Sequence, residues 1–430
     1  MRGRSSGLMG NVAARLAAVV SLALATLMVA RYGGPAAVGI YVLLRVLPSL
    51  VGVVVSAGLP GAVTYFLAGP YREDRRLPLT LVAMALAGGA AGAALWMASA
   101  PLLERVLFPD LALGLVILAG VAVLTRVIVA TSKSCSQGSD DLPGANRVIV
   151  TEEFMFLLAY GLLWAAGVEG YTAVVAGLLI ADVATFSLSW GRLIRRGFFH
   201  GAARPSLRLA RRVASYGLRA QVGGVFTLLN LRLDFILLSV LTGPAVLGVY
   251  AIASKFAELL KVPTLALTYV LYPKFAKDGR ARAATKARTL MPKAGLLVAG
   301  GAIPLWLAAS FVIPAIYGSA FSSAIVPAQI LLLGLALEGV AAVITAFLYG
   351  IGRPGLNSCA LGAGLAVTVV LDLILIPRFG AVGAASASTV AYATSTLALL
   401  FFFRRLGRPE AAPAREVSAL DSALTRADAR

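Results

Sequence analysis

The chain has 430 residues, of which 59% are hydrophobic and only 13% charged, and its mean hydropathy is +0.88. An ordinary soluble domain has roughly 45–50% apolar and about 25% charged residues, so this composition excludes a soluble fold. The 38 Lys and Arg residues exceed the 19 Asp and Glu residues, which gives a formal charge of +19. In a soluble protein such an excess indicates nucleic acid as the partner, so the location of the charge decides its meaning.

Residues that carry metal, thiol or acid–base chemistry are scarce. The chain holds two cysteines, Cys135 and Cys359, and one histidine, His200. These are too few for a zinc site, a redox pair or a His-dependent catalytic triad, and no phosphate-binding loop of the G-x-x-x-x-G-K-[ST] type occurs. We therefore expect no metal, no cofactor and no catalytic residue, and any transport must be passive, gradient-driven or metabolically pulled.

Twelve apolar segments are long enough to cross a bilayer as helices, since about 20 apolar residues span it. The predicted spans are 8–30, 36–58, 77–99, 111–131, 147–167, 171–191, 213–241, 245–272, 290–316, 324–348, 355–376 and 380–403. The first resembles a secretory signal, but a second apolar span follows at once, so we interpret it as a membrane helix. The sequence thus predicts an all-α polytopic membrane protein.

The connecting loops alternate in their Lys and Arg content. The N-terminus, every second loop and the C-terminal segment together hold 26 positive residues, whereas the other six loops hold three. By the positive-inside rule the basic segments and both termini are cytoplasmic. The net charge is then a property of short cytoplasmic loops without aromatic interleaving, which argues against nucleic acid as a partner.

Short segments recur along the chain at a nearly constant offset. Residues 34–41 (GPAAVGIY) and 243–250 (GPAVLGVY) share the pattern G-P-A-x-x-G-x-Y at an offset of 209. Two further echoes, of residues 137–139 and 167–170, follow at offsets of 212 and 213. Each segment alone is typical of a tight turn, but three echoes at nearly the same spacing indicate an internal duplication.

The duplication divides the twelve spans into two halves of six, which keep the same orientation. We therefore predict an N-terminal six-helix lobe (8–191) and a C-terminal six-helix lobe (213–403), related by a pseudo-two-fold axis along the membrane normal. A basic cytoplasmic linker (192–212) joins the lobes, and the polar segment 404–430 is expected to be a disordered cytoplasmic tail. Two similar lobes predict a cleft and alternating access by rocking of one lobe against the other.

Several motifs at the ends of these spans resemble a known transporter family. They are the repeated turns at 34–41 and 243–250, Gly58-Leu59-Pro60, Asp234 within residues 230–234, Tyr272-Pro273, and residues 317–321, 350–353 and 377–383. In this order the set is similar to the polysaccharide-biosynthesis, or O-antigen flippase, branch of the multidrug/oligosaccharidyl-lipid/polysaccharide (MOP) superfamily. The resemblance covers residues 8–403.

The resemblance implies a MATE-like MOP flippase fold whose central cavity is lined by the first, second, seventh and eighth spans. It implies a transporter, not an enzyme, that moves undecaprenyl-pyrophosphate-linked oligosaccharides from the cytoplasmic to the outer leaflet of the bacterial inner membrane. The expected partners are this lipid-linked oligosaccharide, membrane lipids and other polysaccharide-assembly proteins. Twelve spans rather than fourteen distinguish the chain from lipid II flippases.

Charged side chains inside the spans indicate where a substrate binds. A charge at the bilayer centre costs about 2.5–3.5 kcal/mol on insertion scales, so each needs a partner, a water-filled cavity or a function. Guanidinium groups bind phosphate through two donors and ammonium groups act as point charges, so a cationic cleft suits a pyrophosphate. The candidates on the four cavity-lining spans are Arg45, Arg232, Lys255, Arg15, Arg219 and Lys261. Arg45 and Arg232 rank first, because they lie deepest.

Structural alternatives stand beside this assignment. Lys255 and Lys261 lie three residues on either side of Glu258 and could neutralise one another on one helix face. Arg15 and Arg219 lie near helix ends, where long side chains extend to the interface. Arg126, outside the four spans, is expected to be an interfacial anchor.

Three acidic residues are candidates for binding a coupling ion, H⁺ or Na⁺. Asp234 lies two residues from Arg232 and points to another side of its helix, while Glu338 and Asp182 lie in the middle of their spans. The alternative for each is a structural hydrogen bond.

Two other functions compete with the flippase. A cation-coupled multidrug exporter of the same superfamily is expected to have an acidic or apolar cleft, whereas the predicted cleft is cationic. A membrane polymerase or ligase of lipid-linked glycans needs a large outer loop for its catalytic groups, and the outer loops here have about 3–11 residues.

Overall fold

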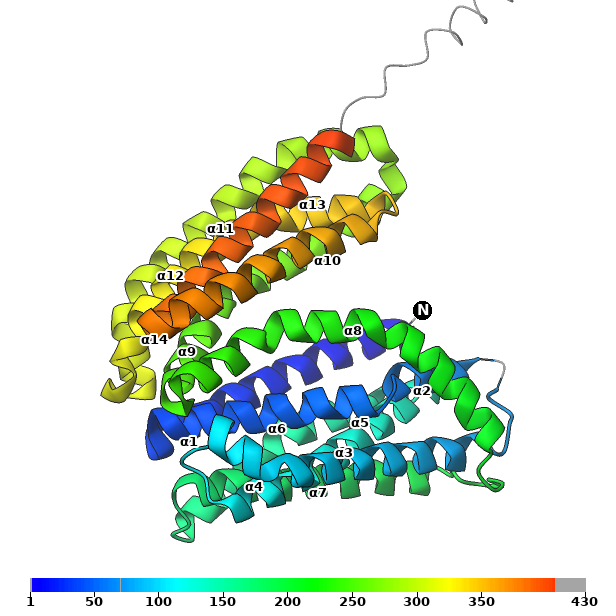
Figure 1. Ribbon diagram of the computed structural model, residues 1–430. Coiled ribbons are helices and arrows are strands. Elements are labelled where there is room, and N and C mark those ends of the chain that lie inside the picture. The colour runs from blue at the N-terminus through cyan, green and yellow to red at the C-terminus, as the bar shows by residue number, and fades with distance from the viewer. Residues whose placement is uncertain (1, 70, 407–430) are drawn as a thin grey trace, which may run out of the picture. The chain divides into compact units, whose positions relative to one another are not determined.

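The computed structural model describes residues 2–69 and 71–406. Within these ranges the side chains are described for all residues except 2–9, 11, 12, 220 and 222–231. Helices joined by short connections make up this part of the chain, which contains no strand (Figure 1). The predicted tail beyond residue 406 lies outside the described residues. Residues 404–406 end the helix Pro354–Leu406, and the disordered tail stays a prediction.

The chain forms two compact units. The first comprises residues 1–252 with 313–324, and the second comprises 253–312 with 325–430. This division differs from the predicted lobes, because α8 (Leu207–Thr242) packs against α1 (Arg2–Val55), α2 (Leu59–Ala68) and α3 (Leu77–Leu107). The lobe boundary at 192–212 stays a prediction; in the structure these residues end one helix, form a connection and begin α8.

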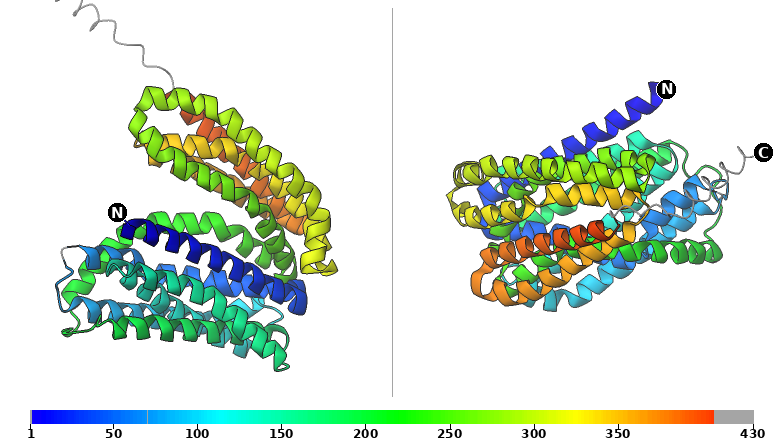
Figure 2. Two further views of the ribbon diagram at one scale, coloured as in Figure 1. Left: turned by 180° about the vertical axis from the view of Figure 1, so that it is seen from behind. Right: turned by 90° about the horizontal axis from the view of Figure 1, so that it is seen from above.

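The first unit is a bundle of long helices in which α1, α6 and α7 lie side by side (Figures 1 and 2). The bounds of α6 and α7 are Leu142–Ala165 and Gly170–Arg195. The unit also contains α4 (Leu113–Ala119), α5 (Val121–Gly138) and the 3₁₀ helix η2 (Ser319–Ala324). α9 (Pro244–Ala257) begins in this unit and ends in the second. Side chains of α1, α5, α6 and α7 therefore meet inside one bundle.

The second unit is also helical. Its elements are η1 (Glu258–Leu260), α10 (Lys261–Asp278), α11 (Arg280–Tyr317, which ends in the first unit), α12 (Ile325–Leu335), α13 (Glu338–Gly350) and α14 (Pro354–Leu406). α10 packs on α13, and α14 packs on both α12 and α13.

Seven helices of the described chain are long and apolar enough to cross a membrane, or eight if the bent pair Ser319–Leu335 and Glu338–Gly350 is one span. Two of the seven, of 43 and 53 residues, are about twice the length that a bilayer needs. Each is broken at a glycine outside helical geometry, Gly34 (φ 72°) and Gly380 (φ 53°). Every predicted span lies largely on helical residues, although turns interrupt or end several of them, and the count of twelve stays a prediction.

The predicted span 36–58 ends differently from expectation. α1 stops at Val55, and a turn then leads into the short apolar helix α2. Gly58 provides the positive φ of 72° that this turn needs, and Pro60 lies in the first turn of α2, where its missing N–H costs nothing.

The two copies of the repeated G-P-A-x-x-G-x-Y segment pack against each other. A Cβ atom on Gly39 would lie within bonding distance of the Pro244 carbonyl oxygen, and one on the equivalent Gly248 would meet the Pro35 carbonyl oxygen equally closely. Reciprocal contact between equivalent residues is the signature of a two-fold relation. The two copies of the segment that is duplicated in the sequence therefore contact each other within the first unit.

The second pair of repeated segments, which contains Gly138 and Gly350, also makes equivalent contacts in the structure. Gly138, at the end of α5, packs closely on Leu67 of α2, and Gly350, at the end of α13, packs closely on Phe275 of α10. Equivalent glycines thus allow equivalent helices to approach in each unit.

Substituting either glycine of the reciprocal contact should destabilise the protein. We expect Gly39→Ala and Gly248→Ala each to lower the free energy of unfolding by about 1–3 kcal/mol or more, because backbone atoms must move apart to admit a methyl group. The measurement is thermal unfolding of detergent-purified protein. Gly61→Ala on α2 is the control, since a Cβ there meets nothing within 4 Å. Equal melting temperatures for all three variants would contradict the packing described.

Candidate functional site

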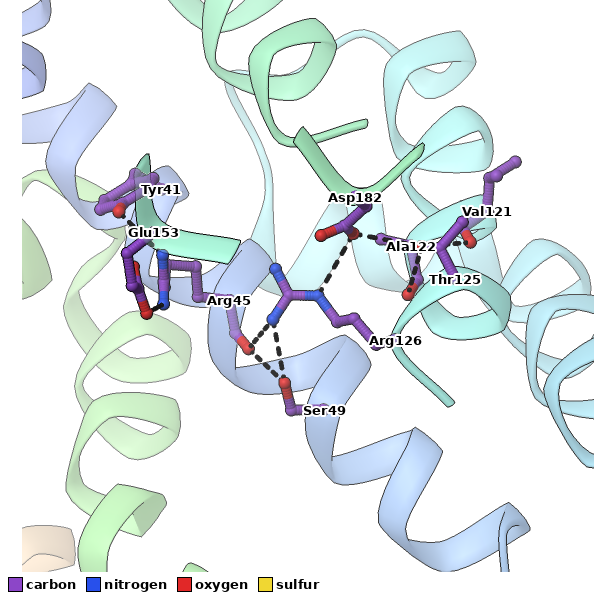
Figure 3. Close-up of polar contacts among 9 residues, drawn as sticks. All are labelled: Tyr41, Arg45, Ser49, Val121, Ala122, Thr125, Arg126, Glu153 and Asp182. Carbon is purple, nitrogen blue, oxygen red and sulfur yellow. Dashed lines mark hydrogen bonds and ion pairs between the residues drawn. The ribbon is translucent and has the colours of Figure 1, made fainter. Parts of the chain in front are cut away.

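Arg45 lies in a buried polar network of the first unit (Figure 3). Its Nη1 donates a hydrogen bond to the hydroxyl of Tyr41, one turn earlier on α1, at 3.1 Å, and its Nη2 forms an ion pair of 2.5 Å with Oε1 of Glu153 on α6. The side chains of Arg45 and Glu153 are 19% and 14% exposed. Tyr41 is fully buried and stacks on Phe156 of α6, with ring centroids 4.7 Å apart. This part of the network joins α1 to α6.

A second ion pair lies beside the first. The Nε of Arg126 on α5 is 3.6 Å from Oδ2 of Asp182 on α7, and the Thr125 hydroxyl donates to the same carboxylate at 3.1 Å. The Nη1 of Arg126 also donates to the Arg45 carbonyl and the Ser49 hydroxyl, both at 3.0 Å (Figure 3). Arg126 is therefore not an interfacial anchor, because its side chain is only 12% exposed and paired inside the bundle.

The network adjoins a cavity of about 210 Å³ with a mixed polar and apolar lining. Its charged and hydroxyl-bearing lining residues are Ser49, Ser56, Arg126, Lys133 and Glu152. The second oxygen of Glu153, Oε2, is buried and has no hydrogen-bond partner among the described residues. A compensated set of guanidinium and carboxylate groups beside a cavity is suited to hold water. A phosphate could use Arg45 only by competing with Glu153.

Two predicted residues of α8 have contacts of a different kind. Oδ1 of Asp234 accepts a hydrogen bond from the Phe235 amide, and Oδ2 accepts one from the hydroxyl of Tyr250, both at 2.9 Å. Tyr250 ends the second repeated segment, as Tyr41 ends the first. The guanidinium carbon of Arg232 lies 5.3 Å from the Phe235 ring centroid, and this side chain forms no ion pair with a described residue.

The predicted residues of the second unit lie near helix breaks. Lys255 is partly exposed in the last turn of α9. Lys261 begins α10, its Nζ lies 5.3 Å from the ring centroid of Tyr392, and it interacts electrostatically with Glu338. Glu338 is the first residue of α13, at the 42° bend after α12.

Arg219 lines an open groove between α2 and the start of α8, of about 610 Å³. We call it the basic–aromatic groove; its lining residues are Tyr65, Phe66, Tyr71, Leu207, Arg208, Arg211, Arg212, Ser215, Tyr216 and Arg219. The rings of Tyr65 and Tyr216 stack 4.3 Å apart at 12°, and these residues are 47% and 38% exposed. None of the described residues that line the groove is acidic.

The structure does not gather the six predicted cationic residues into one described site. Arg15, which is exposed, lies in the first unit with Arg45, Arg219 and Arg232, and each of these four has different surroundings. Lys255 and Lys261 belong to the second unit. A single pyrophosphate site formed by all six stays a prediction, as do the three coupling-ion candidates.

Sequence reasoning missed two features. The partner of Arg45, Glu153, lies 108 residues away, and only the Glu152-Glu153 pair within an apolar span pointed to a role for it. In the basic–aromatic groove, Arg208, Arg212, Ser215 and Arg219 recur at spacings of three and four residues, which places them on one face of a helix. That periodicity was visible within the segment interpreted as a linker and the span that follows it.

No group of three or more His, Cys, Asp or Glu side chains that could hold a metal ion occurs among the described residues.

Comparison with known proteins identifies the family. The family model described as "Polysaccharide biosynthesis protein" matches residues 28–326, which is more than half of the chain. The chain is 24% identical over 272 residues to the uncharacterized membrane protein MJ1068 of Methanocaldococcus jannaschii, covering 61% of this chain and 53% of that protein. It is 22% identical over 285 residues to the probable low-salt glycan biosynthesis flippase Agl15 of Haloferax volcanii, covering 64% and 59%. The matches thus span less than two thirds of the length of these relatives.

Solved structures share the fold. An inward-facing multidrug resistance MATE family transporter of the MOP superfamily matches with a TM-score of 0.72 at 14% identity, covering 91% of this chain and 96% of that one. The lipid II flippase MurJ, in an inward closed conformation, matches with a TM-score of 0.64 at 16% identity, covering 93% and 90%. At these identities the likeness concerns the fold alone. The chain therefore belongs to the polysaccharide biosynthesis protein family and is a multi-pass membrane protein whose fold is that of these solved structures.

Proposed function

We propose that the protein moves undecaprenyl-pyrophosphate-linked oligosaccharides across the bacterial inner membrane for polysaccharide biosynthesis, with both termini in the cytoplasm. The family match and the similarity to a probable glycan biosynthesis flippase support a lipid-linked glycan as cargo. The proposed mechanism is alternating access by rocking of the six-helix lobes 8–191 and 213–403. Membrane lipids and other polysaccharide-assembly proteins are its further proposed partners.

The observation that carries this proposal is the composition of the basic–aromatic groove. Tyr65 and Tyr216 present stacked, exposed rings, and aromatic faces are suited to pack against the C–H faces of sugars. Four arginines line the same groove, and guanidinium groups bind phosphate oxygens through paired donors. Sugar and pyrophosphate are the two parts of the proposed headgroup, and the groove offers a surface for each.

The alternative is a cation-coupled multidrug exporter, which the same fold supports. A groove whose described lining has four arginines and no acidic residue repels organic cations. This charge favours an anionic cargo.

Deletion of the gene distinguishes the glycan-lipid flippase from the multidrug exporter. We expect an undecaprenyl-linked oligosaccharide to accumulate on the cytoplasmic side of the membrane and surface glycan to disappear, because the cargo can no longer cross. Lipid extraction with mass spectrometry and glycan staining measure both. Complementation with the unaltered gene is the control. Normal glycan together with raised sensitivity to cationic drugs would support the exporter instead.

Removing the exposed tyrosine rings should impair transport without unfolding the protein. We expect Tyr65→Ala/Tyr216→Ala to reduce surface glycan by about thirtyfold or more, since each aromatic ring of a stacking platform contributes roughly 1–3 kcal/mol where such platforms bind nucleobases. Tyr65→Phe/Tyr216→Phe keeps the rings and is the matched control. Surface glycan and protein level are measured together, and unchanged glycan in the alanine variant would exclude the groove as a cargo site.

An experiment on Arg45 must also account for its ion-pair partner, Glu153. We expect Arg45→Ala to lower stability by about 3–5 kcal/mol, because Glu153 is left buried and unpaired. Arg45→Met/Glu153→Leu removes both charges and should restore the melting temperature, yet we expect it to lack surface glycan if Arg45 also serves the cargo. Arg232→Ala breaks no described ion pair and should lose glycan at normal protein level. Full glycan in both of these variants would contradict a cationic path through the protein.

A further inference from the structure

A second basic site lies on the first unit, away from the basic–aromatic groove. A groove of about 380 Å³ runs between the beginning of α6 and the end of α7. Four of its lining residues are arginines, namely Arg147, Arg192, Arg195 and Arg196. The only acidic group described in contact with any of them is Asp141, so the groove keeps a net positive charge.

Asp141 holds part of this arginine cluster in place. Its carboxylate caps α6 by accepting from the Gly144 amide at 3.0 Å, and it accepts two hydrogen bonds from Arg192, at 2.8 and 2.9 Å. Nη1 of Arg196 lies 3.3 Å from the same carboxylate. The bonds from Arg192 hold the pKa of Asp141 below its ordinary value, so the carboxylate stays charged and keeps this guanidinium fixed.

Two groups of the groove lack hydrogen-bond or ion-pair partners among the described residues. Arg147 is exposed and makes no hydrogen bond or ion pair with a described residue. The Thr185 side chain lines the groove and is only 1% exposed, and its hydroxyl has no hydrogen-bond partner among the described groups. Because buried hydroxyls in proteins are nearly always hydrogen-bonded, an unpaired one in a groove indicates a missing acceptor or donor.

The groove also has apolar side chains in its wall, beside the hydroxyl groups of Ser136, Thr151 and Ser189. Val148 and Leu188 line it, and Leu188 is 51% exposed. Further along the same two helices Phe154 and Leu158 of α6 and Ile180 of α7 are also exposed, at 41%, 43% and 49%. In a membrane protein such a surface contacts acyl chains. The groove therefore combines a charged mouth with an apolar wall that continues along the helices.

We propose that this groove binds one anionic phospholipid, with its headgroup phosphate between Arg147 and the Asp141-fixed Arg192, and with the Thr185 hydroxyl toward its polar backbone region. The apolar wall favours a lipid over free phosphate, and basic pockets between membrane helices are suited to such headgroups. The site is independent of the transported cargo.

Native mass spectrometry of the detergent-purified full chain with phosphatidylglycerol tests the proposal. We expect one tightly retained lipid per chain, and about tenfold weaker retention for Arg147→Gln and for Thr185→Val, since each loses a bond to the lipid. Neither substitution breaks a described contact, so melting temperatures without lipid should match the unaltered protein. Arg204→Gln, at an exposed arginine outside the groove, is the matched control.

The other arms of the experiment identify the occupant. We expect zwitterionic phosphatidylcholine to be retained more weakly, and inorganic phosphate to leave both the spectrum and the melting temperature unchanged. An Arg147-dependent rise in melting temperature with inorganic phosphate alone would show a site for soluble phosphate and overturn the lipid proposal. Equal phosphatidylglycerol retention in the groove variants and the Arg204→Gln control would overturn it as well.

Discussion

A charge buried in a membrane-embedded bundle must be neutralised by the protein itself, and in the first unit this requirement determines which helices meet. Arg45 pairs with Glu153 and Arg126 with Asp182, so the two pairs connect α1, α5, α6 and α7. An ion pair of this kind adds little net stability over a well-packed apolar pair, but the loss of one partner is costly. The pairs therefore act mainly as constraints on the register of the four helices, and Ser49, Thr125 and Tyr41 make further hydrogen bonds to the charged side chains.

Glycines impose the second constraint, because they let backbones approach where side chains would keep them apart. The reciprocal contact of Gly39 with Pro244 and of Gly248 with Pro35 joins the two copies of the repeated segment. Each copy ends in a buried tyrosine, and the two hydroxyls have opposite partners: Tyr41 accepts from Arg45, whereas Tyr250 donates to Asp234. The duplication has thus kept the packing and diversified the polar chemistry.

Much of the architecture could be predicted from local patterns. Apolar length located helices at all twelve predicted spans, and the offset repeat anticipated the related turns. The turn at Gly58 and the helix α2 were missed, because an apolar segment does not show where it bends. Arg45 was singled out by its depth, but hydropathy cannot locate a partner on another helix, so Glu153 and the pairing of Arg126 with Asp182 required the structure. The basic–aromatic groove combines α2 with α8, which are distant in the chain, and no single sequence window contains it.

The account of the protein as a glycan-lipid transporter depends on an anionic, sugar-bearing headgroup crossing the membrane through this chain. Purified protein should be reconstituted in liposomes that carry an undecaprenyl-pyrophosphate-linked oligosaccharide, and its exposure to a membrane-impermeant glycosidase should be followed over time. We expect the oligosaccharide to become accessible faster with the unaltered protein than in protein-free liposomes or with Arg208→Gln/Arg212→Gln. Equal rates in all three preparations would contradict the account.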